Sequence, residues 1–280
     1  MIAVHELIYD LTDKMPFPDV YISIRQLMGS PDATIRDFEK LVEYDLPLTR
    51  QIIRIANSDF FGFNRKAYDL YDAISLIGVI QLHDLFLSSI CLRIFNETSE
   101  QEASLNGFWQ YGIKRGIAAR TLGKFCRFPA YNRLFALGLL MEIGHVMMTV
   151  KAPELASKAL AINRPFPQSL YRVELECFGF DFCQLGAALV RHWHLPDVYA
   201  QTIEYHSRPE LAEPDYRFQT TLLYLANSML ETPGSLYSQI SQMPAYPQLF
   251  SAIPENIEEI IVKEIADHVI EVFSLLRTYE

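Results

Sequence analysis

The sequence predicts an all-α protein in which an N-terminal helical bundle packs against a second helical half. Apolar residues recur every three or four positions almost throughout, and no run alternates with the period of two that a half-buried strand requires. Only 12 of the 280 residues are glycine, and long segments lack both glycine and proline. Half of the residues are hydrophobic, which is enough to bury a sizeable core.

Capping signals locate the first helices of the N-terminal bundle. After a first helix over about 19–29, Thr34 is a predicted N-cap, and Asp37 can complete a capping box with it. Asp45 is expected to cap the next helix, and Pro47 suits its first turn because no amide donor is needed there. These signals predict three short helices in succession.

The rest of the bundle leads into a polar segment. A helix is expected over 69–76, and Gly78 precedes a strongly apolar helix that extends to about residue 95. Residues 96–106 are polar and are the best candidate for a linker. We therefore assign residues 1–95 to the N-terminal bundle.

The second helical half is predicted to cover residues 107–231. Its expected helices are 108–125, 130–148, 153–162, 169–178, 182–194, 197–206 and 216–231. Residues 232–254 contain several prolines and are predicted to be an irregular connection. An acidic helix follows over about 256–276, so that 232–280 form a separate C-terminal part. The apolar face of this helix packs either on the body of the protein or on a partner.

Composition argues against several classes of partner and location. The net charge of −10 repels phosphate backbones, so we expect no nucleic-acid partner. The four cysteines form no CxxC motif, and no signal peptide is evident, so a cytoplasmic protein with reduced cysteines is predicted. The apolar stretch 134–150 is short for a membrane span and contains Glu142 and His145, so we expect a buried helix and no membrane association.

The basic residues form two small clusters. Arg50 and Arg54 share a helix face, and Lys114, Arg115 and Arg120 lie on another predicted helix. We interpret the members of each cluster as solvated side chains or as ion-pair partners, because the acidic chain offers many carboxylates.

The apolar stretch LFALGLLMEIGHVMM, residues 134–148, contains the most prominent candidate site. Glu142 lies in its middle, and His145 follows three residues later. A buried ionisable group is costly unless it is paired or bound, so this pair is a candidate for function by default. The alternative is that Glu142 is satisfied by Tyr111, by Asn227 or by a helix N-terminus.

Several motifs, taken in their order along the chain, resemble the HDOD family, the HD-related output domains of bacterial signalling proteins. The N-terminal half carries IRIANSDFFGF at 53–63 and the Leu-Ile-Gly step at 76–78. The second half carries Phe-Trp at 108–109, LMEIGH at 140–145 and FGFDFCQLGAALVRHWHLP at 178–196. The resemblance covers about residues 14–230.

The resemblance implies an all-α fold with an HD-like second half and a regulatory role. HDOD proteins are usually output or adaptor modules with protein partners in a signalling pathway, and they often lack the enzymatic residues of the HD phosphohydrolases. Those enzymes hold a metal with imidazole and carboxylate ligands from separate helices.

Compared with the HD enzymes, the corresponding positions have changed together. Tyr111 stands nearest to the first ligand, Met141 and Glu142 replace the His-Asp pair, and Asn227 replaces the late aspartate. A phenol stays protonated at neutral pH, a thioether binds hard divalent ions poorly, and an amide carries no charge. We therefore expect no catalytic residue, no bound metal and no cofactor.

Other polar residues are candidates for a cleft that binds a ligand or a partner. They are His145, His206, Tyr205, Asn57 and Arg65. A simpler interpretation of His206 is an imidazole that bonds to the carbonyls at a helix end. His192 and His194 lie about 200° apart on a helix, so a shared metal is not expected.

The leading expectation is a non-catalytic signal-transduction protein that acts through protein–protein contacts. One alternative is a metal-dependent phosphohydrolase with a rearranged site around Glu142, His145 and His206. A second alternative is a module that binds a nucleotide or another small anionic ligand in the former HD cleft. No Walker A loop, dinucleotide-binding fingerprint, HExxH or GxSxG motif points to a different chemistry.

Overall fold

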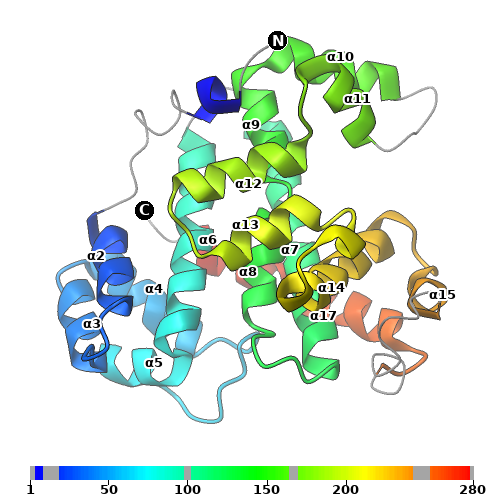
Figure 1. Ribbon diagram of the computed structural model, residues 1–280. Coiled ribbons are helices and arrows are strands. Elements are labelled where there is room, and N and C mark those ends of the chain that lie inside the picture. Colours follow the sequence, from blue (N-terminus) through cyan, green and yellow to red (C-terminus); the bar gives the residue numbers. More distant parts are fainter. Residues whose placement is uncertain (1–3, 9–18, 98–101, 164–169, 242–252, 278–280) are drawn as a thin grey trace.

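A computed structural model describes residues 4–8, 19–97, 102–163, 170–241 and 253–277. These residues contain helices, turns and bends but no β-strand, so the predicted all-α fold is confirmed. Figure 1 shows the short helices α2–α5 gathered on one side of the long helix α6, and the helices of the second half on its other side.

The N-terminal bundle contains the predicted succession of short helices. These are α2 (Asp19–Met28), α3 (Ile35–Val42), α4 (Leu46–Ala56), α5 (Leu70–Ile77) and α6 (Val79–Glu97). The amide of Thr34 donates to the carboxylate of Asp37 at 3.0 Å, which completes the capping box of α3. The carboxylate of Asp45 accepts from the amide of Leu48 at 3.0 Å and caps α4. Both predicted caps are therefore confirmed.

The chain bends sharply between α5 and α6. The two helices meet at 99°, and the intervening Gly78 has φ +80°. Glycine adopts this left-handed backbone conformation without the steric strain that a Cβ atom would add. The bend places the first turn of α6 beside the second half, which matters for the pocket described below.

The described residues of the second half contain nine further helical segments. These are α7 (Glu102–Phe125), α8 (Arg133–Leu140), α9 (Ile143–Lys151), α10 (Pro153–Asn163), α11 (Leu170–Phe178), α12 (Phe182–His192), α13 (Asp197–Tyr205), the 3-10 helix η1 (Pro209–Leu211) and α14 (Pro214–Glu231). Helices α7 and α8 pack closely at two glycine residues, one on each helix. A Cβ atom on Gly116 would lie 2.6 Å from the carbonyl oxygen of Phe135, and one on Gly138 would lie 2.7 Å from the Cα of Gly116. This close packing brings Arg115 onto the end of α8.

Two expectations about helix bounds were wrong. The predicted helix 130–148 is two helices, α8 and α9, separated by a turn at Met141 and Glu142. The turn accompanies a tight contact, since a Cβ on Gly144 would lie 1.9 Å from the carbonyl oxygen of Phe182. The predicted linker 96–106 is largely helical, because α6 extends to Glu97 and α7 begins at Glu102, and 98–101 lie outside the described residues.

The C-terminal part holds more helix than predicted. The expected irregular connection 232–254 includes α15 (Leu236–Ser241), and 242–252 lie outside the described residues. The acidic helix α17 (Ile257–Arg277) packs on α4, α6 and α7 of the same chain. Its contacts reach the N-terminal bundle, where the side-chain amide of Gln51 donates to the carbonyl of Leu275 at 2.8 Å. The body of the protein is thus what covers its apolar face.

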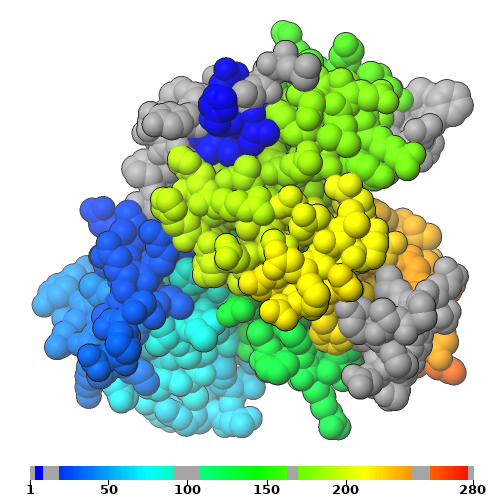
Figure 2. All heavy atoms as spheres, viewed as in Figure 1, coloured from blue at the N-terminus to red at the C-terminus, as the bar shows by residue number. Residues whose placement is uncertain are grey.

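The chain ends and the core join the two halves. Figure 2 shows residues 4–8, in dark blue, against the second half, and Leu7 and Ile8 are buried there. Phe60 of the loop after α4 contacts Phe135 of α8 with ring centroids 5.5 Å apart.

The segment Arg133–Lys151 is apolar and long enough to cross a membrane, but 72% of it is buried inside the protein, as expected of core helices.

Candidate functional site

Glu142 belongs to a group of four charged residues that are buried or half-buried, and we call this group the Glu142 cluster. They are Arg115 of α7, Glu142 in the turn before α9, His145 of α9 and Glu174 of α11. Three separate helices therefore converge on this point, all of them from the second half. The arrangement alternates cation and anion, which is how a protein can bury charge at a tolerable cost.

The contacts of the Glu142 cluster form a continuous chain. Arg115 Nη2 donates to Glu142 Oε2 at 2.5 Å. The same oxygen lies 3.8 Å from His145 Nδ1, and His145 Nε2 lies 2.9 Å from Glu174 Oε1. The side chains of Arg115 and Glu174 are 5% and 4% exposed, so neither charge can be satisfied by bulk water.

Packing and a backbone contact fix the far end of this chain. The ring of His145 stacks on Phe182 with centroids 3.8 Å apart. The amide of Phe182 donates to Glu174 Oε2 at 3.0 Å, so Glu174 also satisfies an N–H group in the first turn of α12. The imidazole therefore has a fixed position between two carboxylates.

The ionisation of the cluster follows from these contacts. Burial by itself would raise the pKa of Glu142, but the charge of Arg115 and the contact with His145 lower it to about 2. Burial would lower the pKa of His145, but its contacts with Glu142 and Glu174 raise it to about 9. At neutral pH Glu142 is a carboxylate and His145 is an imidazolium, which has no free lone pair to offer a metal.

His206 lies near the Glu142 cluster but has its own bonding. Its Nδ1–H donates to the carbonyl of Ile203 at 2.7 Å, which is the helix-end contact expected from the sequence. Burial lowers the pKa of His206 to about 4, so the ring is neutral at pH 7. Its ring also contacts Phe182, with centroids 5.3 Å apart. Tyr205, the preceding residue, is half-buried at the end of α13.

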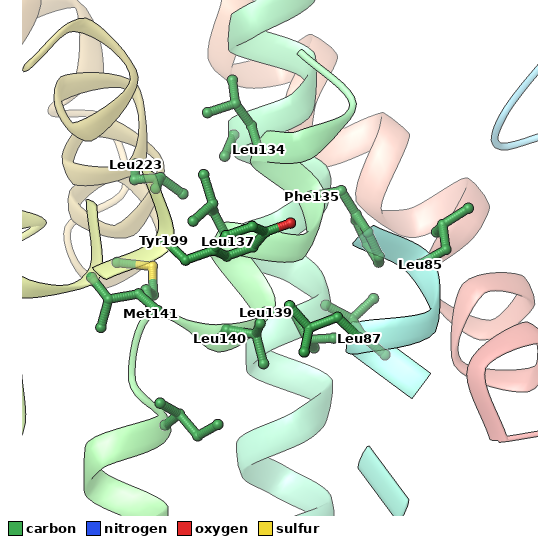
Figure 3. Close-up of a cluster of buried hydrophobic side chains, with 14 of the residues drawn as sticks. Leu85, Leu87, Leu134, Phe135, Leu137, Leu139, Leu140, Met141, Tyr199 and Leu223 are labelled. Carbon is green, nitrogen blue, oxygen red and sulfur yellow. The ribbon is translucent and has the colours of Figure 1, made fainter. Parts of the chain in front are cut away.

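The positions that hold a metal in HD enzymes do not fit one in this chain. Met141 is fully buried, and Figure 3 shows it within an apolar cluster beside Leu223 and the ring of Tyr199. The ring of Tyr111 lies against the guanidinium of Arg115, at 4.5 Å from Cζ to the centroid. Among the described residues, no three His, Cys, Asp or Glu side chains gather in an arrangement that could hold a metal ion.

Asn227, at the fourth of these positions, makes a local hydrogen bond on its own helix. The side-chain amide of Asn227 donates to Glu231 one turn later on α14, at 3.0 Å. The expectation that Tyr111 or Asn227 satisfies Glu142 was wrong, because Arg115 does so. The third predicted partner, a helix N-terminus, is not used either, because Glu142 makes no side-chain capping bond to α9. A buried carboxylate gains most from a cation, and the predicted neighbour His145 lies 3.8 Å from Glu142.

Two residues of the predicted cleft belong elsewhere. Asn57 closes its own loop, since its Nδ2 donates to the carbonyls of Ile53 and Ala67 and its Oδ1 accepts from the amide of Ala67. Arg65 pairs with Asp72 at 3.2 Å on the surface of the N-terminal bundle. The sequence analysis placed Asn57 and Arg65 in one cleft with His145. The structure does not bring them together, and motifs in a sequence do not give distances in space.

His192, His194 and Cys183 do not form a further site. His192 and His194 are both exposed, while Trp193 between them is buried. The thiol of Cys183 lies 3.4 Å from Ser207 Oγ, and burial raises its pKa well above the usual value. A thiol that stays protonated is a poor nucleophile.

A second group of buried polar residues joins the two halves, and we call it the Asp84 cluster. It consists of Tyr21 of α2, His83 and Asp84 of α6, Arg133 of α8 and Tyr199 of α13. The hydroxyl of Tyr199 donates to Asp84 Oδ1, and Arg133 Nε lies 3.4 Å from Asp84 Oδ2. Within the N-terminal bundle, His83 Nε2 lies 2.9 Å from the hydroxyl of Tyr21, which links α6 to α2.

Sequence reasoning missed three important members of these clusters. Arg115 was included in a basic cluster on a helix, where an ion pair was one of two interpretations. Glu174 and Asp84 were not singled out at all. The signal available for Asp84 was a charged residue within a strongly apolar helix, the same signal that pointed to Glu142.

Comparison with known proteins identifies relatives of this chain. The family model of the HDOD domain matches residues 15–209. A curated relative from Treponema pallidum (strain Nichols), named "Uncharacterized protein", is 27% identical over 242 residues, which are 83% of this chain and 46% of the relative. The chain thus spans about half the length of that relative.

Solved structures share the fold. A protein from Shewanella amazonensis SB2B, named "Putative phosphohydrolase", matches with a TM-score of 0.72 at 18% identity, over 99% of this chain and 100% of that chain. One from Marinobacter aquaeolei VT8, named "Putative signal transduction protein", matches with a TM-score of 0.69 at 19% identity, over 99% of this chain and 65% of that chain.

Proposed function

The chain belongs to the HDOD family, and on that premise we propose that it is a non-catalytic signal-transduction module that acts through contacts with protein partners. The observation that carries the proposal is the ion pair between Arg115 and Glu142. Glu142 stands at the position of a metal ligand in the HD enzymes, and here a cation of the protein itself neutralises it. The name of the Marinobacter aquaeolei relative is in keeping with a signalling role.

The surroundings of Glu142 support the same proposal. A metal ion would have to displace a buried guanidinium and compete with the imidazolium of His145 for the same oxygen. Displacing Arg115 would leave a buried cation without its partner, at a cost of several kcal/mol. The cluster therefore favours a closed structural role over an open coordination site.

A metal-dependent phosphohydrolase remains the alternative in the enzyme class. Its candidate ligands would be Glu142, His145 and His206. The only favourable observation is that His206 is neutral and uses Nδ1 alone in its bond to Ile203, which leaves Nε2 as a potential ligand. The second alternative, an anion bound in this cleft, would require Arg115 to exchange Glu142 for the ligand.

The first experiment separates the enzyme from the non-catalytic module. The full chain is purified without chelators, its metal content is measured, and hydrolysis of bis(p-nitrophenyl) phosphate and of nucleotides is assayed with Mn²⁺ or Mg²⁺. We expect no stoichiometric metal, and the same background rate in the parent and in Glu142→Gln. His206→Gln serves as a second variant, since it leaves the Arg115 ion pair intact. Stoichiometric metal, with turnover lost in both variants, would overturn the proposal.

A second experiment tests the protein partner directly. Cross-linking and mass spectrometry in cells of the source organism compare the parent with two surface variants, Tyr44→Ser/Leu46→Ser and Val262→Ser/Ile270→Ser. These four side chains are large, apolar and exposed, as contact residues of partners often are. We expect one specific partner whose recovery falls in one variant and not in the other. Recovery of no specific partner under several growth conditions would contradict the proposal.

A further inference from the structure

A pocket of about 310 Å³ lies where the start of α6 meets the connection between α7 and α8. Its size is within the range of small-molecule sites. One wall is the segment 77–81 together with Asp84, and the other is formed by Pro129, Ala130, Asn132 and Arg133. Each half of the molecule therefore supplies one wall. None of the residues of the Glu142 cluster lines this pocket.

A chain of hydrogen bonds fixes the orientation of the amides in the pocket. Arg120 Nε donates to Asn132 Oδ1 at 2.9 Å, and Asn132 Nδ2 donates to Gln81 Oε1 at 3.0 Å. Because a guanidinium can only donate, both directions are determined. The group left at the end is Gln81 Nε2, a buried donor that has no partner among the described residues. A buried donor of this kind is stabilised when an acceptor reaches it.

The lining has one cation, Arg133, and one carboxylate, Asp84, which is already hydrogen-bonded to Tyr199. Arg133 Nε lies 3.4 Å from Asp84, longer than the usual 2.7–2.9 Å of a charged hydrogen bond. Val79, Ile80 and Gln81 of the lining form the first turn of α6, and a helix N-terminus carries a partial positive charge.

The rest of the lining is apolar. It consists of Ile77, Val79, Ile80, Pro129 and Ala130. Ile80 is 58% exposed at the edge of the pocket and so presents apolar surface there. We propose that this pocket binds a small organic oxyanion, a carboxylate or a phosphate monoester with a compact apolar body. The oxyanion binds to Arg133, Gln81 and the start of α6, and the body lies on the apolar wall.

This inference goes beyond the proposed function and does not depend on it. A ligand at this place contacts both halves of the molecule and lies next to the Asp84 cluster that joins them. It competes with Asp84 for Arg133, so binding is coupled to the contact between the halves. A signalling module and an enzyme could each carry such a site.

The test measures binding of three probes to the full chain by ligand-observed NMR. Benzoate and phenyl phosphate supply the two oxyanions on the same apolar ring, and benzyl alcohol is the neutral control. We expect at least one anion to bind about tenfold or more tightly than the alcohol. Which anion binds more tightly distinguishes a carboxylate ligand from a phosphate ligand. Equal affinity for all three probes, or no binding, would overturn the proposal.

Variants place the binding in this pocket. Ala130→Trp fills the space without removing Arg133, and Gln81→Leu removes the unpartnered donor; each is expected to weaken anion binding about tenfold. Arg133→Gln is compared with Lys124→Gln, which removes the same charge from an exposed residue outside the lining. If Arg133→Gln fails to fold, the first two variants still decide. Binding that survives Ala130→Trp unchanged, or falls equally in Lys124→Gln, would show that the probe binds elsewhere.

Discussion

The Glu142 cluster and the Asp84 cluster both bury a carboxylate beside an arginine, but they stabilise different parts of the molecule. In the first, Arg115 and Glu142 connect helices of the second half alone, and the arginine is almost fully buried. In the second, Asp84 of the N-terminal bundle meets Arg133 and Tyr199 of the second half, and the arginine is about a quarter exposed. One cluster stabilises a half of the protein, and the other joins the two halves.

The two clusters differ in whether a pocket lies beside the buried carboxylate. Glu142 is paired with Arg115, and no residue of its cluster lines the pocket, which is in keeping with the structural role that we propose for it. Asp84 lies in no enzyme motif, yet it lines the pocket between the two halves. The oxyanion site that we propose is therefore at the junction and not at Glu142.

The largest effect is expected from breaking the Glu142 cluster. Glu142→Gln leaves Arg115 buried without a counter-charge, and Arg115 Nε and Nη1 already lack partners among the described residues. We expect the free energy of unfolding to fall by about 4 kcal/mol, as for other broken buried pairs. Urea titration measures it.

The matched control for this change removes both charges. Arg115→Met/Glu142→Gln eliminates the unpaired cation and should recover at least half of the loss. A single Glu142→Gln variant within about 1 kcal/mol of the parent would mean that solvent or another group already satisfies Arg115, and the Glu142 cluster would not be closed.

A smaller effect is expected from breaking the Asp84 cluster. Asp84→Asn keeps an acceptor for Tyr199 but removes the charge opposite Arg133, which can turn toward water because it is partly exposed. We expect a loss of about 2–3 kcal/mol. Both tryptophans, Trp109 and Trp193, lie in the second half, so their fluorescence reports that half while far-UV circular dichroism reports the whole.

The two signals sharpen the comparison between the clusters. The fluorescence and circular-dichroism transitions should coincide in the parent and in Glu142→Gln. They should separate in Asp84→Asn, because the halves lose a buried polar connection. Asp32→Asn, an exposed change in the α2–α3 turn, is the control and should alter neither signal. Coincident transitions in Asp84→Asn would show that other contacts suffice to join the halves.

The smallest of the three effects is the dependence of stability on pH. The pKa of His145 is raised to about 9 from its ordinary 6.5, so its contribution is complete below about pH 6.5 and is lost as pH rises through 9. The pKa of His206 is lowered to about 4, so its contribution is complete above about pH 6.5 and is lost as pH falls through 4. Stability should therefore be greatest near pH 6.5.

His145→Gln separates the two sides of this profile. It should remove the alkaline decline, which we expect to be about 2 kcal/mol because the imidazole is 23% exposed and water screens its ion pairs. The acid side, which belongs to His206 and Glu142, should persist. Chemical unfolding at intervals between pH 4 and 10 measures both limbs. An alkaline decline of the same size in His145→Gln would assign it to another group.

Much of the fold was predictable because its signals are local. Thr34, Asp37 and Asp45 capped helices as expected, because capping depends on residues within one turn. The break between α8 and α9 was not predictable in this way. It depends on the approach of Gly144 to Phe182, 38 positions later in the chain, and on the pull of Arg115 on Glu142.

The sequence by itself determined the helical class and the family, because residue identity and spacing carry that information. Only the tertiary structure decided which residues lie against the buried carboxylates. The charge opposite Glu142 comes from a helix 27 residues earlier, and the partners of Asp84 come from both halves. Whether a buried carboxylate has a functional or a structural role depends on these distances, because electrostatic interactions in a protein interior act between residues that are close in space.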